Sequence, residues 1–196
     1  MARRLNPDAR RAEIIQTATE LISTEGYRAL SLREVARRCG MSAPGLMHYF
    51  ADMPSLLNAV LAHRDEVDIA AIVEEQSESA SLDDVVAEAF DYYRRAGDAT
   101  LRFDALEAEA VDPTHPAHAY YLDRDERSFA QLKPVIEREF DDPDEAFALL
   151  RVVFDGIRFR RLRDPEHVDL MQEWLRVREP VLASLRRRSV APERLH

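Results

Sequence analysis

Residues 31–50, SLREVARRCGMSAPGLMHYF, contain two helix starts separated by a single glycine, and this stretch decides the fold. Ser31 is placed to cap a first helix, because a serine hydroxyl accepts a hydrogen bond from an unpaired backbone N–H, and Glu34 completes a capping box. Gly40 ends that helix, since glycine adopts a positive φ without a Cβ clash, and Ser42 caps the next one. Two helices so close in sequence predict a tight helix-turn-helix.

The distribution of charge favours a DNA-binding motif over an ordinary αα-hairpin, which is the other interpretation of this pattern. Residues 1–50 contain eight arginines and five acidic residues, a net charge of +3, whereas the remainder carries 19 basic and 32 acidic residues, a net charge of −13. A basic head on an acidic body is typical of a protein whose head faces phosphate. Arg3 and Arg4 form either a solvated tail or an arm that settles on DNA.

The segment from Arg11 to about Val60 resembles the TetR family of bacterial one-component transcriptional regulators, and the match is dense and ungapped. Two positions depart from the family pattern. Met47 stands where an aromatic residue is usual, and Met53 stands where a lysine usually contacts a phosphate; neither methionine forms a charge-assisted bond. The matching positions are Ile14-Ile15, Ala18, Leu21, Gly26-Tyr27, Ser31-Leu32, Val35-Ala36, Cys39-Gly40-Met41-Ser42, Gly45-Leu46, His48-Tyr49-Phe50 and Leu56-Leu57.

The resemblance implies an all-α fold in two domains. Residues 1–54 are expected to form a three-helix DNA-binding domain with the helix-turn-helix, and residues 55–196 a helical ligand-binding and dimerisation domain. The implied function is that of a homodimeric, ligand-responsive regulator, which we expect to be a repressor that binds a pseudo-palindromic double-stranded DNA operator and is released by a small-molecule effector. A DNA-binding or partner-binding helical module without a small ligand is the alternative.

Apolar periodicity predicts further helices along the chain, at about 8–24, 52–75, 81–97, 98–110, 117–140, from 143 onward, and 166–188. The polar segment from Glu74 to Ser81 marks a boundary between head and body, and Pro134 and Pro180 predict kinks. The last two helices are apolar on more than one stripe, which favours a homodimer through them over an intrachain core alone. Such a dimer would hold two heads about 34 to 36 Å apart for a two-fold operator.

The candidate DNA-binding residues lie at the start of the first motif helix and along the second. The N-terminal end of the second helix is expected to enter the major groove, where its short side chains offer little bidentate contact with bases. We therefore expect discrimination to depend on Arg33, on apolar contact between Met47 and a thymine methyl, and on DNA shape. By resemblance His48 and Tyr49 contact phosphates, with core packing as the alternative role of Tyr49. The full candidate set is Ser31, Arg33, Ser42, Ala43, Gly45, Met47, His48 and Tyr49.

By resemblance, an effector binds in a cavity among helices five to eight, although each candidate wall residue is equally explained as core. His115 and His118 lie near Asp112 and Asp123, but no cysteine or further histidine completes a ligand set, so we expect capping or pocket-edge roles and neither a metal nor a cofactor. The candidate walls are Phe90, Tyr93, Phe103, Leu106, Tyr120, Tyr121, Phe129 and Phe154.

Several function classes are disfavoured by the sequence. It contains no nucleophile elbow and no phosphate-binding glycine loop, so we do not expect an enzyme. Cys39 is the only cysteine, which excludes an intrachain disulfide and suits a reducing cytosol. We expect no secretory signal and no membrane-spanning segment, and hence a cytoplasmic protein.

Overall fold

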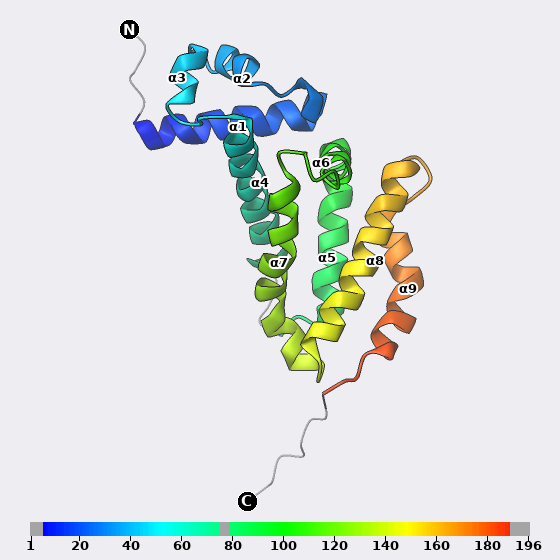
Figure 1. Ribbon diagram of the computed structural model, residues 1–196. Helices are drawn as coiled ribbons and strands as arrows, with labels where there is room; N and C mark the ends of the chain where they lie inside the picture. The colour runs from blue at the N-terminus through cyan, green and yellow to red at the C-terminus, as the bar shows by residue number, and fades with distance from the viewer. Residues whose placement is uncertain (1–5, 75–78, 189–196) are drawn as a thin grey trace, which may run out of the picture. The chain divides into compact units, whose positions relative to one another are not determined.

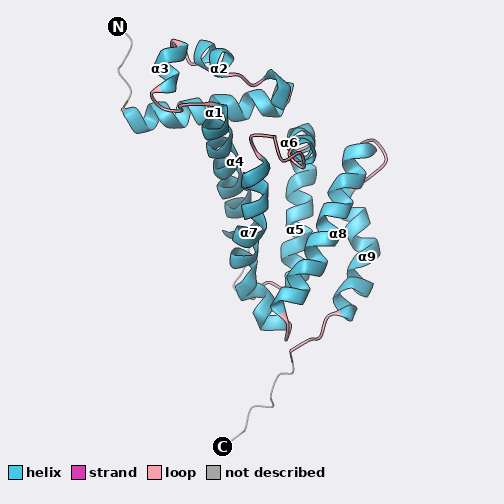
Figure 2. Ribbon diagram, viewed as in Figure 1, coloured by secondary structure: helices cyan, strands magenta, loops and turns pink. Residues whose placement is uncertain are grey.

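The computed structural model describes residues 6–74 and 79–188 of the chain, and this part is α-helical (Figure 1). Helices joined by short loops account for nearly all of it, and the extended pairing in these ranges is one isolated bridge between Phe140 and Arg187 (Figure 2). The predicted all-α fold is confirmed. Arg3, Arg4 and the middle of the polar segment from Glu74 to Ser81 lie outside the described residues.

The helix-turn-helix forms where the capping residues predict it. The helix α1, Pro7–Glu25, ends at Gly26, which has a φ of 87°. A short 3-10 turn, η1 (Tyr27–Ala29), leads to α2, Leu32–Arg38, and α3 spans Ala43–Met47. The hydroxyl oxygen of Ser31 accepts a hydrogen bond from the Glu34 backbone N–H at 3.2 Å, and that of Ser42 accepts from Gly45 at 3.1 Å. Gly40, with a φ of 62°, makes the turn between α2 and α3.

The capping box expected from Ser31 and Glu34 is only half formed. Ser31 caps the helix, but among the described residues the carboxylate of Glu34 binds the side chains of Arg37 and Arg38 instead of returning to the Ser31 backbone. The reason is charge, because a guanidinium forms a stronger, charge-assisted hydrogen bond with a carboxylate than a neutral backbone N–H does.

The helix α4, Met53–Ile69, begins with a complete capping box. The side chain of Asp52 accepts from the Ser55 backbone, and the Ser55 hydroxyl accepts from the Asp52 backbone. Pro54 sits in the first turn, where a missing N–H costs nothing. A π-helical segment, Ala70–Glu74, follows directly, so the helical path continues close to the predicted end near residue 75.

The chain divides into two compact units, and neither unit is one continuous stretch of the sequence. Unit 1 comprises Met1–Ala71 and Ala96–Arg124, and therefore adds α6 (Asp98–Glu109) to the first four helices. Unit 2 comprises Ile72–Arg95 and Asp125–His196, and it holds α5 (Leu82–Arg95), α8 (Pro143–Arg163) and α9 (Leu170–Ser184). The helix α7, His118–Glu139, contributes to both units. The functional division at residues 1–54 and 55–196 stays a prediction.

Each unit has its own apolar core. In unit 1, Ile14, Leu21 and Leu46 are fully buried together with Leu106 of α6. In unit 2, Phe90 and Trp174 are fully buried, and the Trp174 indole N–H donates to Asp83 at 3.0 Å. No helix in the described ranges is both long enough and apolar enough to cross a bilayer.

The last helix is shorter than the sequence pattern predicts. Apolar periodicity predicts a helix over 166–188, but α9 begins after Asp169, whose side chain accepts from the Gln172 backbone, and it ends at Ser184. Beyond it the chain runs extended, and the Arg188 N–H donates to the Glu139 carbonyl at 2.7 Å. Backbone pairing with the end of α7 thus replaces the last helical turn. Pro134 and Pro180 lie inside helices, and the kinks expected at them stay a prediction.

Candidate nucleic-acid interface

The helix α3 is short and is anchored by one side chain. Leu46 is fully buried in the unit 1 core, whereas the next residue, Met47, is 51% exposed. Gly45 keeps the first turn tight, since a Cβ there would lie 3.1 Å from the Ser42 hydroxyl oxygen. Ala43 is partly buried and packs against the core. The exposed residues of α3 are therefore Pro44 and the flexible, apolar Met47.

His48 and Tyr49 follow α3 in a turn and do not extend the helix. His48 is exposed, whereas Tyr49 is partly buried and packs against the unit 1 core. Packing and a phosphate contact through the hydroxyl group are compatible for a tyrosine, because its ring is apolar and its tip is polar. Met53, at the start of α4, is also partly buried against this core.

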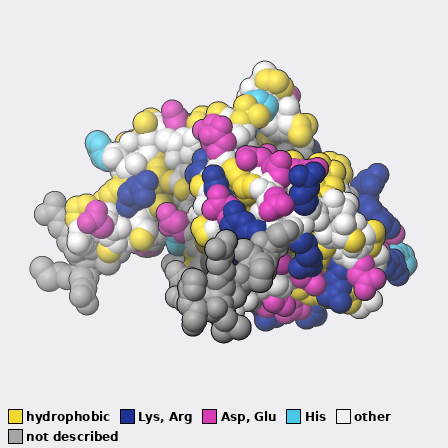
Figure 3. Space-filling view, turned by 90° about the horizontal axis from the view of Figure 1, so that it is seen from below, with side chains coloured by type: hydrophobic (Ala, Val, Ile, Leu, Met, Phe, Trp, Pro, Cys, Tyr) yellow, Lys and Arg dark blue, Asp and Glu magenta, His cyan; other side chains and the backbone are white. Residues whose placement is uncertain are grey.

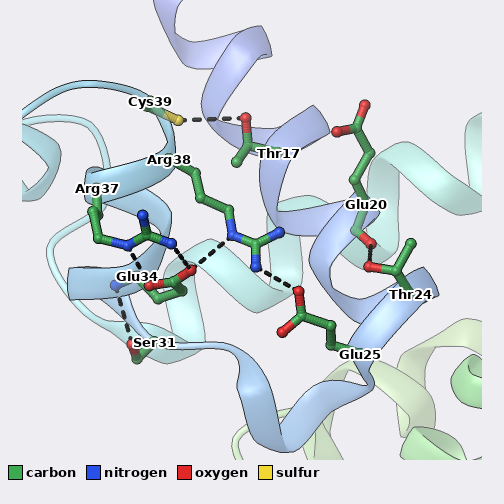
Figure 4. Close-up of polar contacts among 9 residues, drawn as sticks. All are labelled: Thr17, Glu20, Thr24, Glu25, Ser31, Glu34, Arg37, Arg38 and Cys39. Carbon is green, nitrogen blue, oxygen red and sulfur yellow. Dashed lines mark hydrogen bonds and ion pairs between the residues drawn. The ribbon is translucent and has the colours of Figure 1, made fainter.

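Arg33 is the exposed arginine of α2 that has no hydrogen bond or ion pair to any described residue. The other two arginines of this helix are engaged. Arg37 donates twice to Glu34, at 2.8 and 2.6 Å, and Arg38 donates to Glu34 at 2.7 Å and to Glu25 of α1 at 2.5 Å (Figure 4). Of the α2 cations, Arg33 alone reaches solvent without a carboxylate partner in the described chain.

The ion pairs around Glu34 shift the pKa values of the groups that form them. The hydrogen bonds from Arg37 and Arg38 lower the pKa of Glu34 to about 2. The same contacts raise the pKa of both guanidinium groups. This cluster was not among the sequence-based predictions, although Glu34 stands three and four residues before the two arginines, a spacing that places them side by side on a helix.

Two further arginines of α1 lie in the same unit. The Arg11 guanidinium stands 4.9 Å from the centre of the Phe50 ring, and Arg11 is exposed. Arg10 pairs with Glu13 at 2.8 Å and donates to the Cys39 carbonyl at 3.4 Å. The cation–π contact leaves Arg11 charged and accessible, and the candidate set from the sequence did not include it.

The eight predicted effector contacts fall into the two units, four in each. In unit 2, Phe154 stacks near Phe90 and Tyr93, with ring centres 4.7 and 5.8 Å apart respectively. Phe129 instead pairs with Phe147 at 5.0 Å. Phe103 and Leu106 are buried in the unit 1 core, and Tyr120 and Tyr121 pack against that core. Their assignment to one effector cavity stays a prediction.

A polar network ties three helices of unit 1 together beside these residues. The Tyr120 hydroxyl of α7 donates to Asp65 of α4 at 2.5 Å. The guanidinium of Arg124 donates to Asp65 at 3.0 Å and lies 3.7 Å from Glu107 of α6. Arg64 of α4 lies 4.0 Å from the Phe103 ring centre. Charged groups thus join α4 to α6 and to the first turns of α7.

His115, in the loop before α7, and His118, the first residue of α7, have structural contacts. The His118 Nδ1 lies 2.8 Å from the Ala110 carbonyl, and the His115 ring packs edge-on against Tyr27 of η1 at 4.9 Å. Burial lowers the pKa of His115. Asp112 binds Thr114, which lowers the pKa of this carboxyl group, and Asp123 is exposed. Within the described residues no group of three or more potential ligands is placed to hold a metal.

The helix α8 carries an exposed apolar stripe. Val152 is 71% exposed and Phe159 is 50% exposed, and the exposed residues Ala148 and Gly156 continue the same stripe at spacings of three and four. A Cβ at Gly156 would meet nothing within 4 Å. On α9, Leu175 is also exposed. On the face drawn in Figure 3, apolar patches lie among interspersed acidic and basic side chains.

The sequence matches one family model over about a quarter of its length, near the N-terminus. Residues 14–60, which include the helix-turn-helix, match the family described as bacterial regulatory proteins, tetR family. The expected resemblance is confirmed for this segment. A search of curated proteins finds no match.

Solved structures share the fold over nearly the whole chain. A TetR transcription regulator from Haloarcula marismortui aligns with a TM-score of 0.74 and 19% identity, covering 91% of this chain and 100% of its own. A tetR-family transcriptional regulator from Streptomyces coelicolor gives 0.71 and 17%, covering 92% and 83%. The multidrug binding protein EbrR, complexed with imidazole, gives 0.69 and 22%, covering 98% and 96%. Because the identities are only 17% to 22%, the similarity establishes the fold alone.

Proposed function

We propose that this chain, which has a TetR-type segment at residues 14–60 and the fold of TetR-family transcriptional regulators, is a cytoplasmic, ligand-responsive regulator that binds operator DNA as a homodimer. We assign it the role of a repressor. The small-molecule effector binds in the helical body and releases the operator.

The observation that carries the proposal is the exposed surface of the helix-turn-helix. Arg33 projects from α2 without an ion partner in the described chain, and Met47 projects from α3 while Leu46 holds that helix to the core. An unpaired guanidinium can bind a guanine edge or a phosphate, and an exposed thioether can contact a thymine methyl. His48, in the turn after α3, is a further exposed polar residue of the motif.

The homodimer is supported by the apolar stripe of α8. Two helices that pack closely need apolar side chains at spacings of three and four, and a glycine on the stripe permits close approach of the backbones. Val152, Gly156 and Phe159 meet both conditions and are exposed in the single chain. Isologous pairing through α8 and α9 would give the two-fold symmetry that a pseudo-palindromic operator requires.

Effector control is supported by the aromatic side chains in the body and by the polar network that joins α4 to α6 and α7. An effector releases DNA only if it binds more tightly to the conformation that fits the operator poorly. The experiment is a competition in which a panel of aromatic compounds is added to the protein–operator complex. A compound that releases DNA identifies the class of effector, and operator binding that no compound changes favours the module without a small ligand.

DNA binding itself is tested by fluorescence anisotropy with the DNA upstream of the protein's own gene, across a salt series. We expect saturable binding that exceeds binding to a scrambled duplex and that weakens steeply as salt rises, because phosphate contacts release counterions. Equal and weak binding to both duplexes would show that the head has lost its phosphate clamp at Met47 and Met53. The body would then be the functional part of the chain.

A further inference from the structure

The ion-pair cluster at the end of α2 has one carboxylate between two arginines. The two Glu34 oxygens receive three hydrogen bonds of 2.6 to 2.8 Å, two from Arg37 and one from Arg38. The remaining contact of Arg38 reaches Glu25 on α1 at 2.5 Å. Figure 4 shows Arg38 between the two carboxylates, with Arg37 bound to the Glu34 side chain. Two of the three arginines of α2 are therefore held by intramolecular acids.

This arrangement matters because of where α2 lies in a DNA complex. The first helix of a helix-turn-helix crosses the sugar–phosphate backbone. Arg37 stands one turn after Arg33 and shares its helix face. A guanidinium offers the same planar fork to a carboxylate and to a phosphate. The acids of the cluster and the DNA backbone therefore compete for the same donors.

We propose that Glu34, assisted by Glu25, is a specificity-determining residue that occupies Arg37 and Arg38 and so limits the sequence-independent affinity of the head for DNA. The inference rests on the proposed DNA-binding function. Phosphate contacts strengthen binding to every sequence alike, so a carboxylate that withholds two of them lowers nonspecific affinity more than it lowers discrimination. Arg33, which has no such partner among the described residues, keeps its role at the operator.

A purely structural role of the cluster makes a different prediction. The pair of Arg38 and Glu25 joins α2 to α1 and could serve only to brace the motif. Exposed ion pairs contribute little to stability, and Arg37 keeps 70% of its side chain exposed. Loss of a brace would weaken specific and nonspecific DNA binding together, whereas release of two arginines would strengthen nonspecific binding and steepen its salt dependence.

The test compares the full-length protein with Glu34→Gln on a random-sequence duplex, by fluorescence anisotropy across a salt series. We expect the variant to bind this DNA more tightly, and the slope of log affinity against log salt to steepen by about 0.9 for each arginine that gains a phosphate. The ratio of operator affinity to random-sequence affinity should fall. Circular dichroism confirms that the variant is folded as the parent is.

Two further variants separate the release of arginines from the change in net charge. Glu20→Gln removes the same charge from an exposed residue of α1 that binds Gln16 and contacts no arginine in the described chain, so its slope should stay at the parent value. Combining Glu34→Gln with Arg37→Ala and Arg38→Ala should abolish the steepening. If Glu34→Gln fails to fold, Glu25→Gln removes one of the two acids that hold Arg38 and should give a smaller steepening.

The inference is overturned if Glu34→Gln and Glu20→Gln give the same slope, or if Glu34→Gln weakens binding to both duplexes. These results differ from a failure of the proposed function. If the proposed function fails, the parent protein itself shows no preference for an operator, and the inference fails as well. If the parent protein prefers its operator but Glu34→Gln leaves the slope unchanged, the inference fails and the proposed function stands.

Discussion

At the scale of single residues, the difference between Arg33 and its neighbours on α2 is one of partners. Arg37 and Arg38 lie three and four residues after Glu34 and are paired with it, whereas Arg33 precedes Glu34 and has no ion pair with any described residue. Because an acid and a base one turn apart on a helix attract each other, the order of residues along the helix determines which guanidinium groups pair with the carboxylate.

Replacing Arg33 by alanine should weaken operator binding by about 1–3 kcal/mol if the side chain reads a base. The expected cause is the loss of an unpaired guanidinium at the DNA surface. Anisotropy on the operator measures the change. Arg163→Ala is the matched control, because Arg163 is exposed at the end of α8 and its loss changes the net charge equally. Equal affinities for the two variants would contradict the role of Arg33.

The acid titration of Glu34 checks whether its ion pairs persist in solution. Arg37 and Arg38 hold the pKa of Glu34 at about 2, below its ordinary value of 4.5. A depressed carboxyl pKa contributes stability that is present above the unfolded value and is lost as pH falls through the folded value. The contribution should therefore be constant from pH 7 to about 5 and disappear toward pH 2. The carboxyl carbon shift of Glu34 in NMR measures the midpoint, and a midpoint near 4.5 would show that the pairs are not populated.

At the scale of elements, α3 is too short to be stable alone and depends on tertiary contact. Leu46→Ala should destabilise the protein by about 2–5 kcal/mol in urea unfolding, because it removes a fully buried side chain and leaves a cavity. The neighbouring change Met47→Ala should alter stability by less than about 0.5 kcal/mol, since that side chain is exposed, while still weakening operator binding. A large loss of stability in Met47→Ala would place that side chain in the core.

The helix starts could be predicted from the sequence because capping is local chemistry. Ser31, Ser42 and Asp52 each bind a backbone N–H three residues ahead. The end of α9 could not be predicted, because it depends on backbone pairing between Arg188 and Glu139, which are remote in sequence. The partners of Glu34 were missed for a different reason, which is local: a capping box and an ion pair compete for the same carboxylate.

The grouping of the aromatic residues also depends on remote contacts. Phe90 and Phe103 both look like body residues in the sequence, yet Phe90 is buried with unit 2 and Phe103 is buried with the helix-turn-helix in unit 1. Periodicity shows which face of a helix is buried, but it does not show which other helix covers that face. The positions of the candidate DNA-binding residues on their helices were easier to predict, because most of these residues lie within a few residues of the caps at Ser31 and Ser42.

At the scale of the whole molecule, the exposed stripe of α8 predicts the oligomeric state. Val152→Glu should convert a dimer into a monomer at micromolar concentration, because it buries an unpaired charge in an apolar interface. Sedimentation velocity measures the change. Leu122→Glu is the matched control, since Leu122 of α7 is 65% exposed and lies outside α8 and α9. Dissociation by the control variant, or a Val152→Glu protein that stays dimeric, would contradict the assignment of the interface.

The central claim is that two helix-turn-helix heads of a symmetric dimer read a specific DNA sequence. Selection of bound duplexes from a random pool, followed by sequencing, tests it most directly, because the selection itself identifies the operator. We predict enrichment of an inverted repeat whose half-site centres are separated by about one helical turn, or 10 base pairs, or a multiple of it. A pool that shows no enriched sequence after repeated rounds would contradict the claim, and so would an enriched half-site that never occurs as an inverted pair.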